Sequence, residues 1–277
     1  MEKVDANHEL IETVGKIKCS SLFAMINVNN DVFCVKSLKD KNAPEGTKYP
    51  VVLHIIRDFT SNKIHSKQII RTDSGSTLIA EHANSITYHA GVFYMTTGNA
   101  ITNGCQVVSF GENGIVKKHI GYKKKIYSIN YYDTHNGNLR FLVSIDHDKD
   151  KHEYSYHLVR LSGTKFIFEN VCFTLKDGIA SYNTGNDSFY DQEHKSLYTT
   201  MFVDSKSSYI TKNLIYQYDL GSTLSGRIYV PARAVFINAK DTEQKFEIEG
   251  MFIKNSRKYV CANVSPNDDG VFVIAKK

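Results

Sequence analysis

Short runs of β-branched and aromatic residues recur along the whole chain, separated by polar segments rich in Gly, Asn, Asp and Ser. This spacing is typical of short antiparallel strands joined by hairpin turns. The strands it predicts span residues 22–27, 32–36, 51–56, 86–88, 92–96, 106–110, 126–132, 141–145, 156–161, 197–202, 214–218, 246–253, 258–263 and 271–274. Residues 8–14 fit either a short helix or a further strand, because so short a segment does not favour a helix by itself. We therefore expect an all-β fold.

A two-strand pattern repeats along the chain and distinguishes between all-β architectures. Each copy opens on a small residue, then has an apolar residue, any residue, and an aromatic or apolar residue; a polar turn and a second apolar strand follow. The copies begin at Ser21, Ser85, Ser128, Asp187 and Gly250, and the first is the weakest. Propeller blades usually repeat every 40–50 residues or so, and loops account for the longer spacings here. The pattern predicts a single-domain, five-bladed β-propeller; the main alternative, a pair of β-sandwiches, would not explain the repeats.

The last predicted blade is short of one strand. The blades span approximately residues 18–72, 78–121, 123–176, 177–240 and 245–277, and only three strand-like runs follow residue 245. Residues 8–17 precede the first repeat, so we expect them to supply the missing outer strand. Pairing the N-terminal strand with the last blade closes the ring and removes an exposed sheet edge.

Composition and charge narrow the function classes. Of the 277 residues, 42% are hydrophobic and 23% are charged, as in globular proteins. No apolar run approaches the roughly 18 residues of a membrane-spanning helix, and no secretory signal is visible, so we expect no membrane insertion and a cytoplasmic location by default. The net charge of +5 is mild and predicts no nucleic-acid partner. The densest basic cluster, Lys117–Lys118 with Lys123–Lys125, is expected in two solvated turns flanking a strand, or as a small patch for phosphate or an anionic polymer.

The cysteines and the acidic segment offer no metal or cofactor motif. The five cysteines are Cys19, Cys34, Cys105, Cys172 and Cys261. Their number is odd, no Cys-x-x-Cys occurs and most lie in apolar runs, so buried, unpaired thiols are expected. Asp146, Asp148 and Asp150 have calcium-loop spacing, but Lys151 stands where glycine is needed and His157 where a bidentate glutamate is needed. We expect a solvated hairpin of the third blade there, with no metal and no cofactor.

The residues just before the five repeats are the candidate ligand-binding set. The innermost strand of each propeller blade begins at one end of the central channel, so these residues are expected to form a ring there. They are Ser20, Asn84, Tyr127, Asn186 and Glu249, with His82 and Asp187 beside them. Such a ring suits a small polar ligand, for example a glycan fragment. The same groups can also satisfy strand ends and channel water.

Three functions stay open at this point. The first is a binding module that recognises a small polar ligand at the channel mouth. The second is a glycan-acting hydrolase or lyase, because two carboxyl groups can act as acid and base; Glu249 and Asp187 are the candidates, with His82 as a further one. Alternation along the strand puts Glu247 on the same side as Glu249. The third is a scaffold that binds another protein through its faces and its loops 38–49 and 204–213.

Two segments carry a resemblance to a known group. His82-Ala83-Asn84-Ser85-Ile86-Thr87-Tyr88 and Glu247-Ile248-Glu249-Gly250-Met251 resemble the inner-strand motifs of bacterial five-bladed propellers, in which a His-x-Asn-[Asp/Ser] or [Gln/Glu]-Gly motif opens the innermost strand. Asn186-Asp187 fits more loosely. The chain is similar in this respect to the TagC-like propellers of teichoic-acid-related and phage receptor-binding proteins. That resemblance implies a protein that binds or acts near cell-surface polymers.

Overall fold

The computed structural model describes residues 2–16, 22–37, 49–59, 64–80, 83–97, 105–122, 125–148, 153–176, 184–202, 212–238, 246–264 and 270–276. Every regular element within these ranges is a β-strand. The described residues therefore hold no helix long and apolar enough to cross a membrane.

The strands group into antiparallel sets of four that follow the chain. The first set is β2 (Leu22–Val28), β3 (Asp31–Ser37), β4 (Tyr49–Arg57) and β5 (Ile64–Ile69); the second is β7 (Ile86–His89), β8 (Val92–Thr96), β9 (Cys105–Phe110) and β10 (Val116–Gly121). The third is β11 (Ser128–His135), β12 (Asn138–Asp148), β13 (Glu153–Ser162) and β14 (Lys165–Lys176); the fourth is β15 (Thr184–Asp191), β16 (Ser196–Phe202), β17 (Lys212–Asp219) and β19 (Arg233–Asn238). The fifth is β20 (Phe246–Lys254), β21 (Arg257–Val264), β22 (Gly270–Lys276) and β1 (Glu2–Lys16). Two short strands, β6 (Ile79–Ala80) and β18 (Ile228–Tyr229), pair with β4 and β14.

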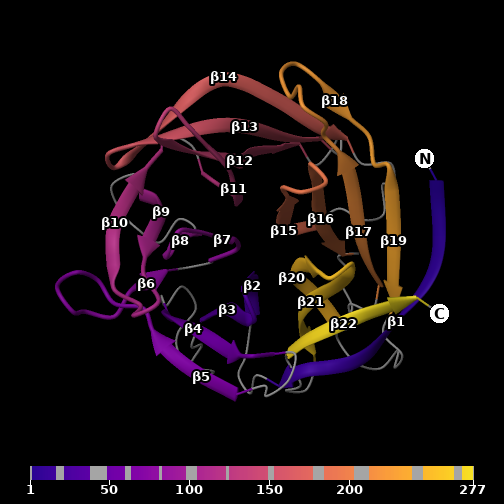
Figure 1. Cartoon of the computed structure of the whole chain (residues 1–277), viewed down its shortest axis with the longest axis horizontal. Helices are drawn as coiled ribbons and strands as arrows, with labels where there is room; N and C mark the ends of the chain where they lie inside the picture. The colour runs from indigo at the N-terminus through magenta and orange to yellow at the C-terminus, as the bar shows by residue number, and fades with distance from the viewer. Residues whose placement is uncertain are drawn as a thin grey trace.

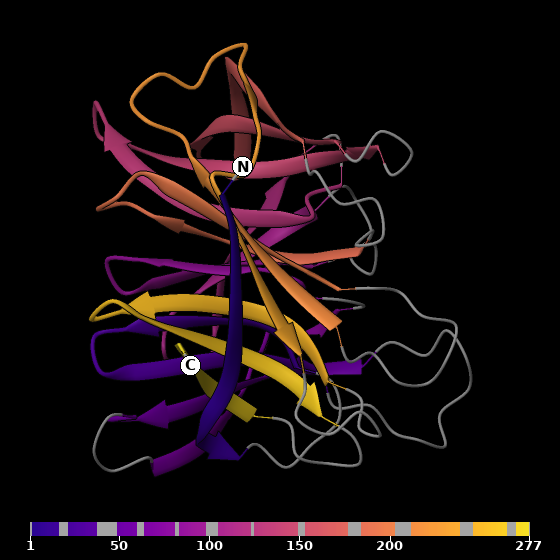
Figure 2. The same cartoon turned by 90° about the vertical axis from the view of Figure 1, so that its right-hand side faces the viewer.

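The sets stand around a common axis, with β2, β7, β11, β15 and β20 nearest to it (Figure 1). Turned on its side, the molecule shows the inner hairpins gathered on one face (Figure 2). Their tips take left-handed backbone angles, for example at Asn29, Ala90 and Asn136. Tight turns of this kind match the right-handed twist of the strands that they join. Each inner strand therefore runs toward the hairpin face.

The N-terminal strand β1 completes the fifth set. Its second half pairs antiparallel with β22, from His8 opposite Lys276 to Lys16 opposite Gly270. Its first half pairs in parallel with β19, from Glu2 opposite Arg233 to His8 opposite Ile237. The segment expected to supply the last outer strand is thus that strand, and the helical alternative for residues 8–14 is wrong. Since β1 pairs with both neighbours, it also covers the outer edge between the fourth and fifth sets.

The apolar core lies between neighbouring sets rather than at the axis. Four buried clusters fill the junctions, and each combines side chains of two or more sets. Phe33 of the first set packs on Phe93 of the second at 4.8 Å between ring centroids, and Tyr94 of the second packs on Phe141 of the third at the same distance. This arrangement buries the second strand of a set on both faces, as in β8 and β16.

Side chains replace backbone pairing where one inner strand meets the next. The Tyr131 N–H donates to Thr87 Oγ1 at 2.9 Å, and the Tyr190 N–H donates to Asn130 Oδ1 at 2.9 Å. At the next junction the Asn213 amide donates to the Phe246 carbonyl at 2.9 Å. Each buried backbone group at these junctions needs a hydrogen-bond partner. Such side chains therefore fix the position of one strand set along the axis relative to its neighbour.

One prediction about local structure is corrected by the strands. Lys117 and Lys118 do not lie in a turn; both stand inside β10 with exposed side chains, where an outer strand faces solvent. Ser21, where the first repeat copy is predicted to begin, lies outside the described residues.

Candidate functional site

The structure describes some of the predicted site residues and not others. Ser20 and His82 lie outside the described residues. Asn186 lies on β15, and the structure describes its backbone only. Asn84 is half-buried just before β7. Tyr127 precedes β11, is 37% exposed, and has the Lys125 ammonium 4.8 Å from its ring centroid.

Asp187 and Glu249 both stand at irregularities of the inner strands. In β15 the pairing with β16 jumps from Gly185–Met201 to Ser188–Thr199, so two residues of β15 face one residue of β16. In β20 the pairing with β21 jumps from Ile248–Ala262 to Gly250–Cys261, which leaves Glu249 as the extra residue. A β-bulge changes where a side chain points and is frequent beside active sites. The bulges therefore set the direction of both carboxyl groups.

Asp187 is a buried acid in a polar environment. Its residue is 7% exposed, its Oδ1 accepts the Ser188 N–H at 2.7 Å, and its carboxyl also bonds the Ser85 hydroxyl from the second set. Burial raises the pKa of Asp187 well above its ordinary value, although both hydrogen bonds act in the opposite direction. The protonated form is consequently favoured over a wider pH range than for an exposed aspartate.

Glu249 accepts a hydrogen bond from a side-chain amide. The residue is 8% exposed, and its Oε1 accepts a hydrogen bond from Asn263 Nδ2 at 2.7 Å. The same Asn263 side chain bonds the backbone of Leu22, so Glu249 is tied to the junction between the fifth and first sets. The Asn263 amide therefore orients the Glu249 carboxyl group.

Gly250 lies between the residues that carry the two acids. A Cβ at Gly250 would lie 3.1 Å from the Met25 nitrogen and 3.3 Å from Asp187 Oδ2, so the Asp187 carboxyl rests against the residue next to Glu249. Burial raises the pKa of the neighbouring Cys261 thiol well above its ordinary value, and Cys34, Glu249 and Asp187 add to that shift. Asp187 and Glu249 are therefore both close enough to Cys261 to act on its thiol, whereas Tyr127 is exposed.

The remaining chemistry predictions have mixed outcomes. Cys34 and Cys261 are buried and form no disulfide among the described residues, whereas Cys172 is exposed on the outer strand β14, so the expectation of burial is wrong for that residue. Asp146 and Asp148 belong to β12, which pairs with β13 as a hairpin of the third set. Among the described residues, no group of three His, Cys, Asp or Glu side chains is arranged to hold a metal ion.

A pocket of about 380 Å³ lies near the other end of the inner strands. Of the predicted ring residues that the structure describes, none lines it. The sequence analysis missed this pocket because most residues around it belong to the repeat pattern. Each of them has the type expected of an ordinary strand residue, so none indicates a binding site. It is a separate feature from the carboxyl pair.

Comparisons with known proteins identify the fold. No family model and no curated protein matches the chain. A glycosyl hydrolase of Bacteroides ovatus matches with a TM-score of 0.53 and 12% identity, over 98% of this chain and 91% of that one. A structure described under the GH130 family, with glycoside hydrolases that target β-1,2-mannosidic linkages in Candida mannan, matches with a TM-score of 0.54 and 10% identity, over 92% and 84%.

An exo-β-1,3-galactanase of Phanerochaete chrysosporium matches with a TM-score of 0.52 and 10% identity, over 94% of this chain and 60% of that one. At such identities the likeness concerns the fold. Together with the radial strand sets, it shows that the chain has an all-β, propeller-like fold of the kind found in carbohydrate-active proteins.

Proposed function

We propose that this chain is a five-bladed β-propeller that cleaves a glycan, with Asp187 as general acid and Glu249 as base or nucleophile. The five strand sets are the proposed blades, with boundaries near those expected from the repeats and with β1 as the outer strand of the last blade. The observation that supports the proposal is a pair of buried acids on neighbouring inner strands, with the Asp187 carboxyl packed against Gly250, the residue next to Glu249.

The two carboxyl groups differ in the way that glycoside cleavage requires. One group must donate a proton to the leaving oxygen, and the other must attack the sugar or activate water. The raised pKa of Asp187 supports the role of proton donor. Glu249 accepts a hydrogen bond from the Asn263 amide, which orients its carboxyl group for the second role. The bulge at each residue supports a functional reading, since a regular strand would not need one.

The substrate class follows from the fold and the sequence together. The structural neighbours are described as acting on β-1,2-mannosidic linkages and β-1,3-galactan. The motifs around Asn84 and Glu249 resemble those of propellers associated with cell-surface polymers. We propose a surface polysaccharide or a fragment of it as substrate, with Ser20, His82, Asn84, Tyr127 and Asn186 as the residues that bind it.

A binding module is the second candidate. It is favoured by the close packing at Gly250, where a methyl group would lie 3.1 Å from the Met25 nitrogen and 3.3 Å from Asp187 Oδ2. Carboxyl groups fixed in so tight a setting can recognise sugar hydroxyls without any chemistry.

Turnover and binding assays separate the candidates. The purified chain is incubated with β-1,2-mannan, β-1,3-galactan, teichoic acid and 4-nitrophenyl glycosides, and released reducing ends or nitrophenol are measured. Binding to the same polymers is measured in parallel. Turnover that Asp187→Asn and Glu249→Gln abolish, and that Glu247→Gln retains, supports the enzyme. Binding without turnover would contradict the enzyme and support the module. The absence of both turnover and binding would contradict both candidates and leave the protein scaffold as the remaining function.

A further inference from the structure

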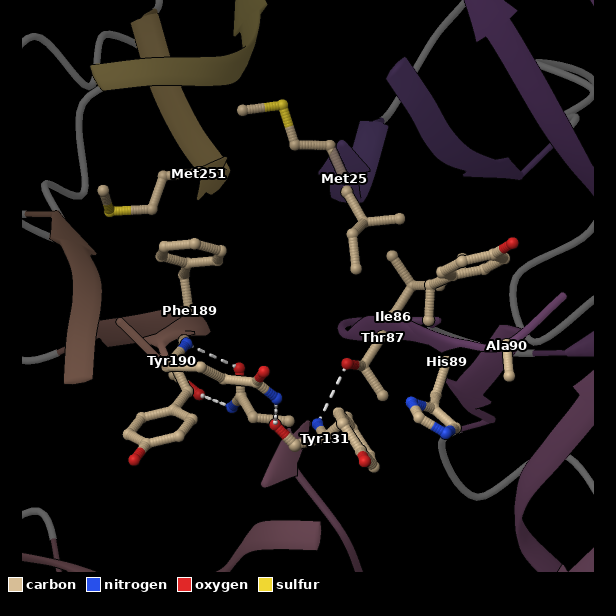
Figure 3. A pocket seen from close by; sticks show the side chains of 14 residues that line it. Met25, Ile86, Thr87, His89, Ala90, Tyr131, Phe189, Tyr190 and Met251 are labelled. Carbon is tan, nitrogen blue, oxygen red and sulfur yellow. Dashed lines mark hydrogen bonds between the residues drawn. The ribbon is translucent and has the colours of Figure 1, made fainter. Parts of the chain in front are cut away.

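The pocket at the hairpin end of the inner strands is a second concave site. Its volume of about 380 Å³ lies within the range of roughly 300–1,000 Å³ usual for small-molecule sites. Residues from all five strand sets line it, so it sits on the axis of the molecule (Figure 3). Neither Asp187 nor Glu249 belongs to its lining.

The inner wall of this pocket is apolar. Met25, Ile86, Phe189 and Met251 come from four different sets and surround the open space in Figure 3. Two of the four are methionines, whose flexible thioether side chains adapt to ligand shape and make favourable contacts with aromatic rings. The wall therefore suits the flat faces of a ring compound.

The polar groups of the wall already have partners. Thr87 Oγ1 accepts the Tyr131 N–H. Asn130 donates to the Ser188 hydroxyl at 2.7 Å and accepts the Tyr190 N–H at 2.9 Å. A ligand rich in hydroxyl groups would lose its hydration here and find few free partners, which is costly. The inner wall thus disfavours a sugar.

Hydrogen-bonding capacity remains at the rim. The His89 ring stacks on Tyr131 at 4.0 Å between centroids, and within the described residues no hydrogen bond occupies its nitrogens. The Gln192 amide donates to the carbonyls of Tyr131 and Tyr132 at 3.2 Å, which leaves its side-chain oxygen as an acceptor. A ligand can therefore make one or two directed contacts at the mouth.

Among the described residues that line the pocket there is no Asp, Glu, Lys or Arg. An ion would enter without a charged partner, and burial of an unpaired charge is expensive. For comparison, an apolar cavity of about 150 Å³ accommodates benzene, so this pocket has room for a larger ring system. We propose that it binds a neutral aromatic compound of one or two rings, which carries one hydrogen-bonding group toward His89 and Gln192.

Indole is a suitable probe, because it is neutral, has two fused rings and carries one N–H donor. The full chain is labelled with ¹³C at its methionine methyl groups and titrated with indole in NMR experiments. Met25 and Met251 line the pocket, whereas Met95 and Met201 are buried elsewhere and serve as internal controls. Leucine substitutions at Met25 and Met251 assign their signals. The proposal expects saturable shifts of these two methyl groups and constant signals for the other two.

Two comparisons make the test specific. Ala90 is exposed and lines the mouth, so Ala90→Phe should fill it and weaken indole binding by about tenfold or more. Asn136→Phe is the matched control, since Asn136 is an exposed residue of another hairpin with the same left-handed backbone. The anion indole-3-carboxylate should bind about tenfold more weakly than indole. Absence of saturation, equal shifts at all four methionines, or equal binding of the anion would overturn the proposal.

Discussion

The side chain of Asn263 binds both backbone groups of Leu22. The Leu22 N–H donates to Asn263 Oδ1 at 2.7 Å, and Asn263 Nδ2 donates to the Leu22 carbonyl at 3.2 Å. The same amide nitrogen reaches Glu249 Oε1 at 2.7 Å. One side chain thus joins the last strand set to the first and orients a candidate catalytic carboxylate, although Asn263 and Leu22 are far apart in sequence. Ring closure and the proposed site depend on the same residue.

Removal of this amide should cost stability. Asn263→Ala leaves the buried Leu22 backbone groups without their partner, and each unsatisfied group costs about 1–3 kcal/mol. We expect a loss of about 2–4 kcal/mol in the free energy of urea unfolding. Asn138→Ala is the control, since Asn138 bonds a hairpin carbonyl in an exposed setting and should change stability by less than about 0.5 kcal/mol. Equal effects of the two substitutions would contradict the closure role.

The buried carboxyl of Asp187 should make stability depend on pH. Because its pKa is raised in the folded state, the folded chain holds a proton that the unfolded chain loses near pH 4. Stability from this group is complete below that pH and falls as the pH rises toward the folded-state pKa. Asp187→Asn keeps an acceptor for the Ser188 N–H but cannot ionise. As the pH rises above about 4, urea unfolding should therefore show an increasing stability of the variant relative to the natural chain. A stability difference that does not depend on pH would refute the assignment.

A methyl group at Gly250 should disturb the site as well as the fold. Its Cβ would meet the Met25 nitrogen at 3.1 Å and Asp187 Oδ2 at 3.3 Å, and backbone atoms cannot move away easily. Overpacking of this kind usually costs about 1–3 kcal/mol. Thermal unfolding of Gly250→Ala should show a lower melting temperature. An unchanged melting temperature would mean that the inner strands are less closely packed than described.

Strand β1 should be necessary for a soluble fold. It covers β22 on one side and β19 on the other, so deletion of residues 2–16 leaves both strands with unpaired backbone groups. Exposed edges of this length promote association between chains. Size-exclusion chromatography of the truncated chain should show aggregates. A soluble, monomeric truncated chain with an unchanged melting curve would exclude the proposed closure.

The cysteines should differ in reactivity. Cys172 is exposed, whereas Cys261 is buried and its raised pKa further lowers the thiolate fraction. Iodoacetamide should modify Cys172 in the native protein about 100-fold faster than Cys261, as followed by peptide mass spectrometry. Under denaturing, non-reducing conditions all five cysteines should be labelled. Fewer labels would reveal a disulfide.

The inner strands could be predicted from sequence, while several outer strands could not. Strands next to the inner ones, such as β8, are buried on both faces and form nearly continuous apolar runs. The outer strand β10 has exposed Lys117, Lys118 and His119 between buried Val116 and Ile120, so its composition resembles that of a turn. Strand pairing along β9, rather than its own hydrophobicity, determines this element.

The candidate site was predictable in part for a similar reason. The repeat pattern located Asp187 and Glu249, because both stand at the beginning of a recurring motif. It did not reveal the bulges, since strict alternation assumes regular pairing. It also did not reveal the role of Asn263, whose partners lie on a distant part of the chain and are set by ring closure.

The rate and affinity of Glu249→Gln on one oligosaccharide test the proposed catalytic role most directly. The substrate is the glycan that the natural chain cleaves fastest, and kcat is measured together with Kd from binding without turnover. If Glu249 takes part in bond cleavage, kcat should fall by about 10²–10⁴-fold while Kd changes by only a few-fold. A variant that loses affinity and retains kcat, or a natural chain that cleaves none of the glycans, would contradict the account.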